Sequence, residues 1–449
     1  EVSQASLIKC TEHVMLPNPT DDENAFPDGQ ARSRWIDDGE NKTVWYQDVC
    51  GHFEGWPFLT DAIVGARGAW SLYLSTGNTT FLSWAYQVTV NSLQRAEDAK
   101  VLTWMQSGDS HAETGKNQQR VGQPAGQSSS TPALELRHLA KGCSSFMESN
   151  SGYPRKYHSN GTLVGETKAL STNMLYYNGY YLAGKMGQLL QIPEATNAMH
   201  FEKAKLLRDA IRSKLWLKQR GYYSYLEDEN DETLTQMEGL GEALVLLSPE
   251  FETSSHRIRA ILDRTYRTER GLPCLWPRFD NWNHKSNDIA QWYHNGRIWP
   301  FVQGYWAIAA ARHRNEGVFA EEVLSLLHLA QGNSTFAEFY ELDGTFPARR
   351  RRQLWSSSGF LGMVYHGIFG MTLQPEGIEF APMKPTELAL GETITLLNFA
   401  YRSCTFDIEV HGEGTNVASF SINGEPQERP FFPSDSDSGH HSLRIILSP

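Results

Sequence analysis

Helical periodicity in consecutive pairs of segments most strongly limits the folds that this chain can adopt. Apolar residues recur three and four positions apart up to Thr76, and the same spacing returns after a short turn at Gly77. Further segments with helical spacing are 132–148, 171–191, 204–215, 236–248, 253–266, 298–312, 317–331 and 355–368. Longer polar connections, such as residues 106–131, separate the pairs. The inner helices of a helical toroid are reached from one open face, so this order of turns and loops predicts a toroid. A superhelical repeat protein would show a fixed period, and the sequence has none.

The spacing changes to alternation in the last part of the chain. Residues 405–411 alternate strictly between apolar and polar side chains, and residues 417–422 continue in the same way. Asn423-Gly424 is a typical signal for a two-residue hairpin turn. This part of the chain is therefore predicted to be an all-β module.

The change occurs near Met371 and divides the 449 residues into two predicted domains. Residues 1–370 are expected to form a mainly α toroid that begins with an irregular segment. Residues 371–449 are expected to form an antiparallel β-sandwich packed on the helices.

Charge and hydropathy exclude two classes of partner. The net charge is −12, whereas nucleic-acid binding needs a basic surface, and the single dense basic run, Arg349–Arg352, is short. No segment approaches the roughly 20 consecutive apolar residues of a membrane-spanning helix. We therefore expect neither a nucleic acid nor a membrane as partner, and the oligomeric state stays open.

Several features favour an extracellular protein without a metal or cofactor. The chain starts at Glu1 without an initiator Met, which is typical of a processed N-terminus. Sequons for N-glycosylation occur at Asn41, Asn78, Asn160 and Asn333. The five cysteines include no CxxC pair, which argues against a zinc cluster and allows one or two disulfides. No P-loop, GxGxxG, GxSxG or HExxH motif occurs, so we predict no metal and no cofactor.

Aromatic residues make up 12% of the chain, which suits a carbohydrate-binding cleft because aromatic faces stack on sugar rings. Hydrolysis of a glycosidic bond needs two carboxyl groups on opposite sides of that bond. A first group of acids among aromatics comprises Asp48, Glu54 and Asp61. The apolar setting between Phe53 and Trp56 would raise the pKa of Glu54, as a general acid requires. Asp61 suits the first turn of a helix equally well, because the helix dipole favours an anion there.

Three further clusters carry candidate site residues. Glu338 lies between apolar residues in AEFYELDG, at the expected end of a helix. Glu238 lies at a predicted helix start, where stabilisation of the helix end explains it as well as catalysis does. The segment WYHNGRIWP places His294, Asn295 and Trp299 in one short turn and offers hydrogen-bonding and stacking groups for a substrate.

The Glu338 segment resembles the glucosidase half of glycogen debranching enzymes, which belong to the six-hairpin glycosidases. In that family a Glu stands six residues before a Gly and precedes a QxWS helix start. Glu338 and Gly344 have that spacing here, and Gln353, Trp355 and Ser356 follow. The resemblance implies an (α/α)6 toroid and the role of general base for Glu338.

The early cluster is similar to bacterial α-L-rhamnosidases, in which a Glu acts as general acid and an Asp follows seven residues later. Glu54 and Asp61 have that separation. The WYQD segment also resembles the WxxD of debranching enzymes, which would make Asp48 the acid. The acid is therefore one of three residues, with Glu54 our first choice. The similarity covers roughly residues 45–370 as an order and spacing of motifs.

These observations predict an inverting, exo-acting glycoside hydrolase that cleaves α-glycosidic linkages of oligo- or polysaccharides. Glu338 would be the base and Glu54 the acid, with Asp61 next. The expected sugar-binding residues are Asp48, Trp56, Glu238, His294, Asn295, Trp299 and Trp355.

Two other functions remain open from the sequence. A polysaccharide lyase on a similar toroid would need a Tyr or His base and a group that neutralises a uronate, and His294, Asn295 and Arg297 could supply these. A non-catalytic carbohydrate-binding protein would use the aromatic residues alone.

Overall fold

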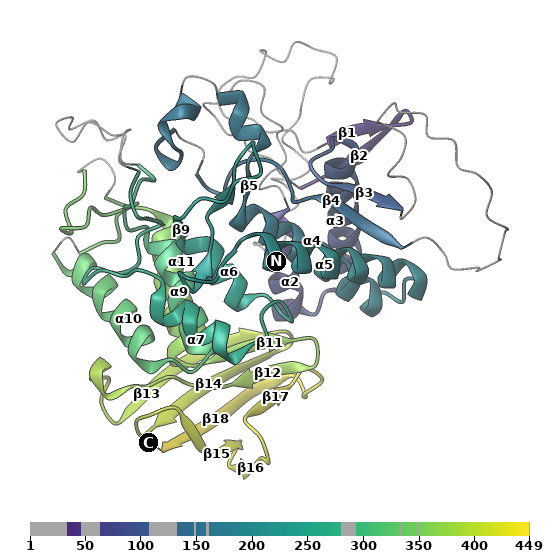
Figure 1. The fold of residues 1–449 in the computed structure, drawn as a ribbon. Coiled ribbons are helices and arrows are strands. Elements are labelled where there is room, and N and C mark those ends of the chain that lie inside the picture. The colour runs from purple at the N-terminus through teal and green to yellow at the C-terminus, as the bar shows by residue number, and fades with distance from the viewer. Residues whose placement is uncertain are drawn as a thin grey trace, which may run out of the picture.

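The chain folds into a helical body followed by a β-rich C-terminal part (Figure 1). The computed structural model describes residues 34–45, 63–106, 133–147, 150–158, 161–279, 293–332, 334–347 and 351–448. Asp48, Glu54, Trp56 and Asp61 lie outside these residues.

Most of the predicted helices are present with nearly the predicted bounds. They are α2 (Val64–Thr76), α3 (Thr79–Asp98), α4 (Leu170–Leu189), α5 (Glu194–Lys214), α6 (Gly239–Leu247), α7 (Ser255–Arg264), α9 (Pro300–Arg312), α10 (Glu316–Gln331) and α11 (Leu354–Gly362). A π-helical turn, Met363–Ile368, continues α11. Gly77 ends α2 in the left-handed conformation, with φ 68°, which a residue without Cβ adopts at no steric cost.

The predicted helix at 132–148 is wrong. Its first half is strand β4 (Leu134–His138), which pairs antiparallel with β3 (Thr103–Gln106). Exposure alternates along β4, because Leu134, Leu136 and His138 point to the more buried side. Tertiary pairing with β3 therefore decides the structure of a segment whose apolar spacing fits a helix as well.

Helix α4 lies at the centre of the helical body. It packs against α2, α3, α5 and α6, and almost every residue from Leu170 to Gly187 is buried. A second group forms where α9 packs against α6, α10 and α11. The crossing of α9 and α11 is tight, because a Cβ on Gly304 would lie 2.6 Å from the Cα of Gly359.

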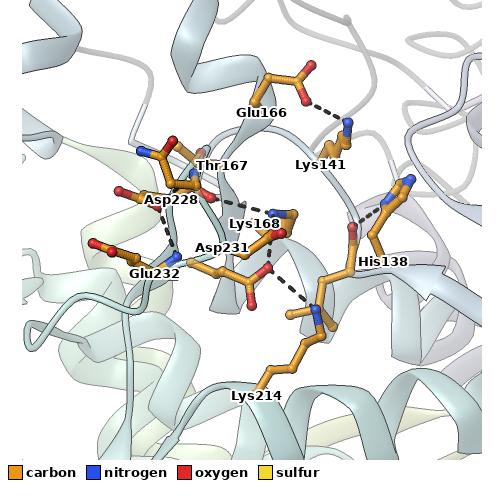
Figure 2. A network of polar contacts seen from close by, with 12 residues as sticks. His138, Lys141, Glu166, Thr167, Lys168, Lys214, Asp228, Asp231 and Glu232 are labelled. Carbon is orange, nitrogen blue, oxygen red and sulfur yellow. Dashed lines mark hydrogen bonds and ion pairs between the residues drawn. The ribbon is translucent and has the colours of Figure 1, made fainter.

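An ion network around the buried Lys168 and Glu227 lies at the start of α4 (Figure 2). Lys168 belongs to β5 (Lys168–Ala169), which pairs with β8 (Leu226–Glu227). Its ammonium lies 2.9 Å from the carboxylate of Glu227 and also contacts that of Asp231. Lys214, at the end of α5, approaches Glu227 to 3.6 Å. This network fixes the backbone immediately before Ser171, a residue of the site described below.

The C-terminal part contains a three-stranded and a five-stranded sheet. The first has the order β11 (Met371–Gln374), β12 (Gly377–Phe380) and β17 (Phe431–Pro433). The second has the order β13 (Thr393–Tyr401), β14 (Cys404–His411), β18 (Gly439–Ser448), β15 (Asn416–Ile422) and β16 (Glu425–Pro426). The first strand begins at Met371, the position at which the sequence pattern changes.

The prediction of a wholly antiparallel module is wrong, because β14 and β18 run parallel. Their register places Ile408 opposite Leu443 and Val410 opposite Ile445, and all four side chains are buried. Alternation in the sequence fixes which side chains share a face but not the direction of the neighbouring strand. The predicted hairpin turn joins β15 and β16: Asn423 and Gly424 both have positive φ, at 53° and 86°.

Backbone contacts join the C-terminal part to the helices. Arg314 donates to the carbonyl oxygens of Ala381 and Pro382, and the N–H of Arg402 donates to the carbonyl oxygen of Ser75. None of the helices in the described ranges is long and apolar enough to cross a membrane.

Candidate functional site

The segment that carries Glu338 is held by a two-stranded bridge and not by a helix. Helix α10 ends at Gln331, so the expectation that Glu338 ends a helix is wrong. Ser334 has a φ of 51°, which takes the chain out of the helical direction. The N–H of Ile298 donates to the carbonyl of Tyr340 (3.0 Å), and the N–H of Tyr340 donates back (2.8 Å). This bridge brings the AEFYELDG and YHNGRIWP segments together, as the sequence could not show.

Glu338 is almost completely buried, with aromatic residues beside it. Only 5% of it is exposed, and its neighbours Ala337 and Phe339 are fully buried. The hydroxyl of Tyr293 donates a hydrogen bond of 2.5 Å to Oε1 of Glu338. Tyr293 was part of the motif seen in the sequence but was not selected there, although a phenol at the same turn was a usable signal. The apolar setting predicted for Glu338 is present.

A continuous group of aromatic rings extends from Tyr293 to the surface. The ring of Trp299 lies 4.9 Å from that of Tyr293 and 5.5 Å from that of Trp355. Trp355 also stacks on Phe301, with 4.7 Å between ring centroids. Trp299 is fully buried, whereas Trp355 is 37% exposed. Of these two predicted stacking residues, Trp355 therefore offers a ring surface, and Trp299 supports it from inside.

His294 and Asn295 build the turn that positions Tyr293. The buried His294 ring stacks on Trp299 at 5.1 Å, and burial lowers the pKa of His294 to about 3. The side chain of Asn295 is bonded at both ends to Phe279, since its Oδ1 accepts from the N–H (2.9 Å) and its Nδ2 donates to the carbonyl (3.3 Å). Both residues thus make contacts that hold protein segments together.

The two acids that follow Glu338 are engaged in local contacts. Arg297 binds Glu341, with its Nε 2.7 Å from Oε1, and its guanidinium lies 4.5 Å above the ring of Phe339. Asp343 accepts from the N–H (2.9 Å) and the hydroxyl (2.7 Å) of Thr345, and these bonds lower the pKa of Asp343. Glu338 is therefore the acid of this segment that lies beside the group of aromatic rings.

The motif spacing has a structural explanation. Gly344 has a φ of 87° and closes the turn after Glu341, which favours glycine. Gln353 caps α11, because its side chain accepts from the N–H of Leu354, and its own N–H donates to the carbonyl of Phe336 (3.2 Å). The last contact ties the start of α11 to the residues just before Glu338, and so places Trp355 near this segment.

Glu238 lies at the predicted helix start, in β9 (Met237–Glu238), directly before α6. It is fully buried. The hydroxyl of Ser144 donates to its Oε1, and the N–H of Ser171 donates to its Oε2 at 2.9 Å. Burial outweighs these bonds and raises the pKa of Glu238 to about 7. Ser144 and Ser171 were not identified from the sequence, where single serines carry no signal.

Within the described residues, no three His, Cys, Asp or Glu side chains lie close enough together to hold a metal ion. Cys143 is disulfide-bonded, and Cys274 and Cys404 are buried free thiols. Cys143 thus takes part in one of the one or two disulfides that the five cysteines allow.

No protein-family model and no curated protein sequence matches the chain. Solved structures do. A sialidase matches with a TM-score of 0.58 at 15% identity, over 84% of this chain and 32% of the sialidase chain. A GH78 family rhamnosidase of Bacillus sp. GL1 matches with a TM-score of 0.47 at 10% identity, over 86% and 34%. A GH63 mannosylglycerate hydrolase from Thermus thermophilus matches with 0.45 at 13%, over 68% and 76%.

The chain spans about a third of the sialidase chain, and the likeness at 15% identity concerns the fold. The structural neighbours include glycoside hydrolases, as the resemblance of the sequence to six-hairpin glycosidases predicts.

Proposed function

We propose that this chain is an extracellular glycoside hydrolase, built on an (α/α)6 toroid, that cleaves α-glycosidic linkages from a chain end with inversion. The observation that carries the proposal is the setting of Glu338. Its carboxyl group is nearly buried, is held by the Tyr293 hydroxyl, and lies in a group of aromatic rings that ends in the exposed Trp355. Glycoside hydrolysis requires carboxyl groups beside the cleaved bond, and Glu338 is proposed as one of them, with Trp355 as a ring that stacks on sugar.

In this mechanism Glu338 takes a proton from a water molecule, which then attacks the anomeric carbon. A second carboxyl group protonates the leaving oxygen on the other side of the bond. Glu54 is our choice for this acid, followed by Asp61 and Asp48. Inversion requires the two carboxyl groups to be roughly 6.5–9.5 Å apart, so that a water fits between base and sugar. Tyr293 fixes the orientation of Glu338 and would keep it aimed at this water.

The polysaccharide lyase is the less favoured alternative, because its required groups are engaged elsewhere. Asn295 is bonded to Phe279 at both ends of its amide, and Arg297 is paired with Glu341. His294 is buried against Trp299. A uronate-neutralising or proton-abstracting role for these residues would break the turn that holds Tyr293.

Two observations support an extracellular location. Cys143 is disulfide-bonded, which is typical of proteins from oxidising compartments. Asn41 and Asn78, two of the four sequon asparagines, are exposed. Carbohydrate is accordingly the proposed partner.

The test is a panel of 4-nitrophenyl α-glycosides and oligosaccharides, with the anomeric form of the first product followed by NMR. We expect hydrolysis of at least one sugar with inversion, and loss of that activity in Glu338→Gln, which keeps the side-chain shape but cannot accept a proton. Asp343→Asn, on the same turn, is the control and should stay active. Products that absorb in the ultraviolet as unsaturated uronates would replace the hydrolase with a lyase. Full activity of Glu338→Gln would exclude Glu338 as the base.

A further inference from the structure

An aromatic pair lies on the surface next to the catalytic segment. Tyr266 follows α7, and Trp276 lies in β10 (Leu275–Trp276). Their rings are stacked nearly parallel, with centroids 4.2 Å apart and planes 8° apart. Tyr266 is 40% exposed and Trp276 is half-buried. Trp276 covers one face of the Tyr266 ring, and Tyr266 nevertheless stays exposed.

Two arginines join this pair to the segment that carries Glu338. Arg270, on the loop of Tyr266, has its Nε 3.6 Å from where a Cβ of Gly344 would lie. Arg278, two residues after Trp276, donates to the carbonyl of Gly296 (3.2 Å) and lies 3.9 Å from the carboxylate of Glu341. The pair is therefore anchored to both segments of the bridge that presents Glu338.

The backbone beneath the pair is well fixed. The hydroxyl of Thr268 donates to the carbonyl of Gly271 and accepts from the N–H of Arg270, both at 3.0 Å. On the other side, the N–H of Cys274 donates to the carbonyl of Arg297 (2.8 Å). A flat ring held in this way loses little freedom on binding, which favours a ligand.

Packing alone does not account for this arrangement. A stacked ring in a protein core is covered on both faces, whereas 40% of Tyr266 is exposed. Exposed aromatic surface with guanidinium groups beside it combines a stacking face for a pyranose ring with donors for its hydroxyls. Arg270 is only half-buried and could supply such donors.

We propose that Tyr266 and Trp276 form a second sugar-binding subsite that holds a further ring of an oligosaccharide whose terminal bond is cleaved at Glu338. This inference rests on the proposed function. In an enzyme that acts on chain ends, the rest of the chain lies on the leaving-group side of the cleaved bond. The subsite therefore binds the leaving part of the substrate and makes the enzyme favour longer chains.

The test compares substrates of different length. Tyr266→Ala should reduce kcat/KM about three- to tenfold for the longer members of a disaccharide-to-hexasaccharide series, the range that one aromatic contact contributes. The matching 4-nitrophenyl monoglycoside should be hydrolysed at the wild-type rate, because it does not reach the subsite. Tyr266→Phe should retain the preference for long chains, and Leu189→Ala, which removes another exposed apolar side chain, should change nothing.

The outcomes separate the subsite from the function on which it rests. An equal loss on short and long substrates would show a structural role for Tyr266 and overturn the subsite. Unchanged kcat/KM at every length would overturn it as well, while an inactive Glu338→Gln would leave the proposed function in place. Wild-type protein that hydrolyses no sugar at all would remove both. Binding of the hexasaccharide to Glu338→Gln, followed by tryptophan fluorescence, should weaken by the same factor when Tyr266→Ala is added.

Discussion

Two buried glutamates lie at bridges between short strands, and their surroundings differ in one respect. Both oxygens of Glu238 accept bonds from groups of the protein, the Ser144 hydroxyl and the Ser171 N–H, and none of Glu238 is exposed. Glu338 accepts from Tyr293 and is 5% exposed, in a group of rings that reaches the surface at Trp355. Burial and an apolar setting are common to both, so these properties alone do not identify a catalytic carboxylate.

This difference suggests different roles for Glu238 and Glu338. Glu238 joins the segment around Ser144 to the first turn of α4 and to the start of α6. The same segment carries Phe146, whose ring lies 5.4 Å from that of His294 in the turn that holds Tyr293. Under the proposed function, Glu238 would hold these segments in position, whereas Glu338 would be the residue that acts on the substrate.

The largest expected effect is the loss of activity in Glu338→Ala. Chemical rescue of this variant by azide distinguishes the proposed role of Glu338 from that of Glu238. Glu338→Ala should lose activity by about 10²–10⁴-fold, the contribution of a general base. Added azide should restore turnover and yield a glycosyl azide of inverted configuration, because the small anion enters the cavity and attacks the anomeric carbon without needing a base. The measurement is product analysis by NMR with and without azide.

Glu238→Ala is the matched comparison. It leaves the Ser171 N–H buried without an acceptor, which costs about 1–3 kcal/mol of stability, and leaves the Ser144 hydroxyl with the Ser171 hydroxyl (3.2 Å) as its neighbour. We expect a lower unfolding midpoint and no response to azide. Rescue of Glu238→Ala instead of Glu338→Ala would reverse the comparison and make Glu238 the catalytic carboxylate.

Much of the fold could be predicted because apolar residues recur at helical spacing within the segments that form helices. The segment 132–148 was misjudged because pairing with β3, a partner about thirty residues away in sequence, decided its structure. The parallel pair of β14 and β18 was missed for a similar reason, since alternation is the same in either direction. The spacing of apolar residues in a segment shows which side chains are buried. It does not show which segment packs or pairs against them.

The candidate site shows the same limit at the level of single residues. The sequence gathered His294, Asn295 and Trp299 in one turn and assigned them to the substrate. In the structure, Asn295 bonds to Phe279, and His294 and Trp299 stack on each other. Glu338 could be identified as a candidate catalytic residue because its apolar neighbours are adjacent in sequence. The direction in which a turn residue points depends instead on contacts with distant segments, which the sequence does not show.

The second prediction concerns how the pH dependence of protein stability follows from the ionisation of Glu238. Its pKa in the folded protein is raised from 4.5 to about 7, so the folded state holds the proton more tightly than the unfolded state. The resulting stability is fully present below pH 4.5 and is lost as the pH rises to about 7. A shift of this size corresponds to roughly 3 kcal/mol at most.

Glu238→Gln stays neutral at every pH and should lose this dependence. We expect the variant to gain stability relative to the wild type between pH 5 and pH 8, measured as the difference between their urea unfolding midpoints. Glu322 also has a pKa raised by burial to about 7, so Glu322→Gln serves as the control for a second buried carboxyl group of this kind. A constant difference between wild type and Glu238→Gln across this range would show that Glu238 is ionised in the folded protein throughout.

The smallest expected effect tests whether the opening beside Glu338 is where the sugar lies. Trp355→Ala should raise KM about three- to tenfold, which corresponds to the loss of one aromatic contact, and should change kcat little, because the ring binds ground state and transition state alike. Leu354→Ala is the control, since Leu354 is 81% exposed and precedes Trp355 in the same turn of α11. A fall in kcat with unchanged KM would mean that Trp355 acts through Trp299 and Tyr293 on the orientation of Glu338. In that case the rings would form a support for the base, and the sugar would have to reach Glu338 from another side.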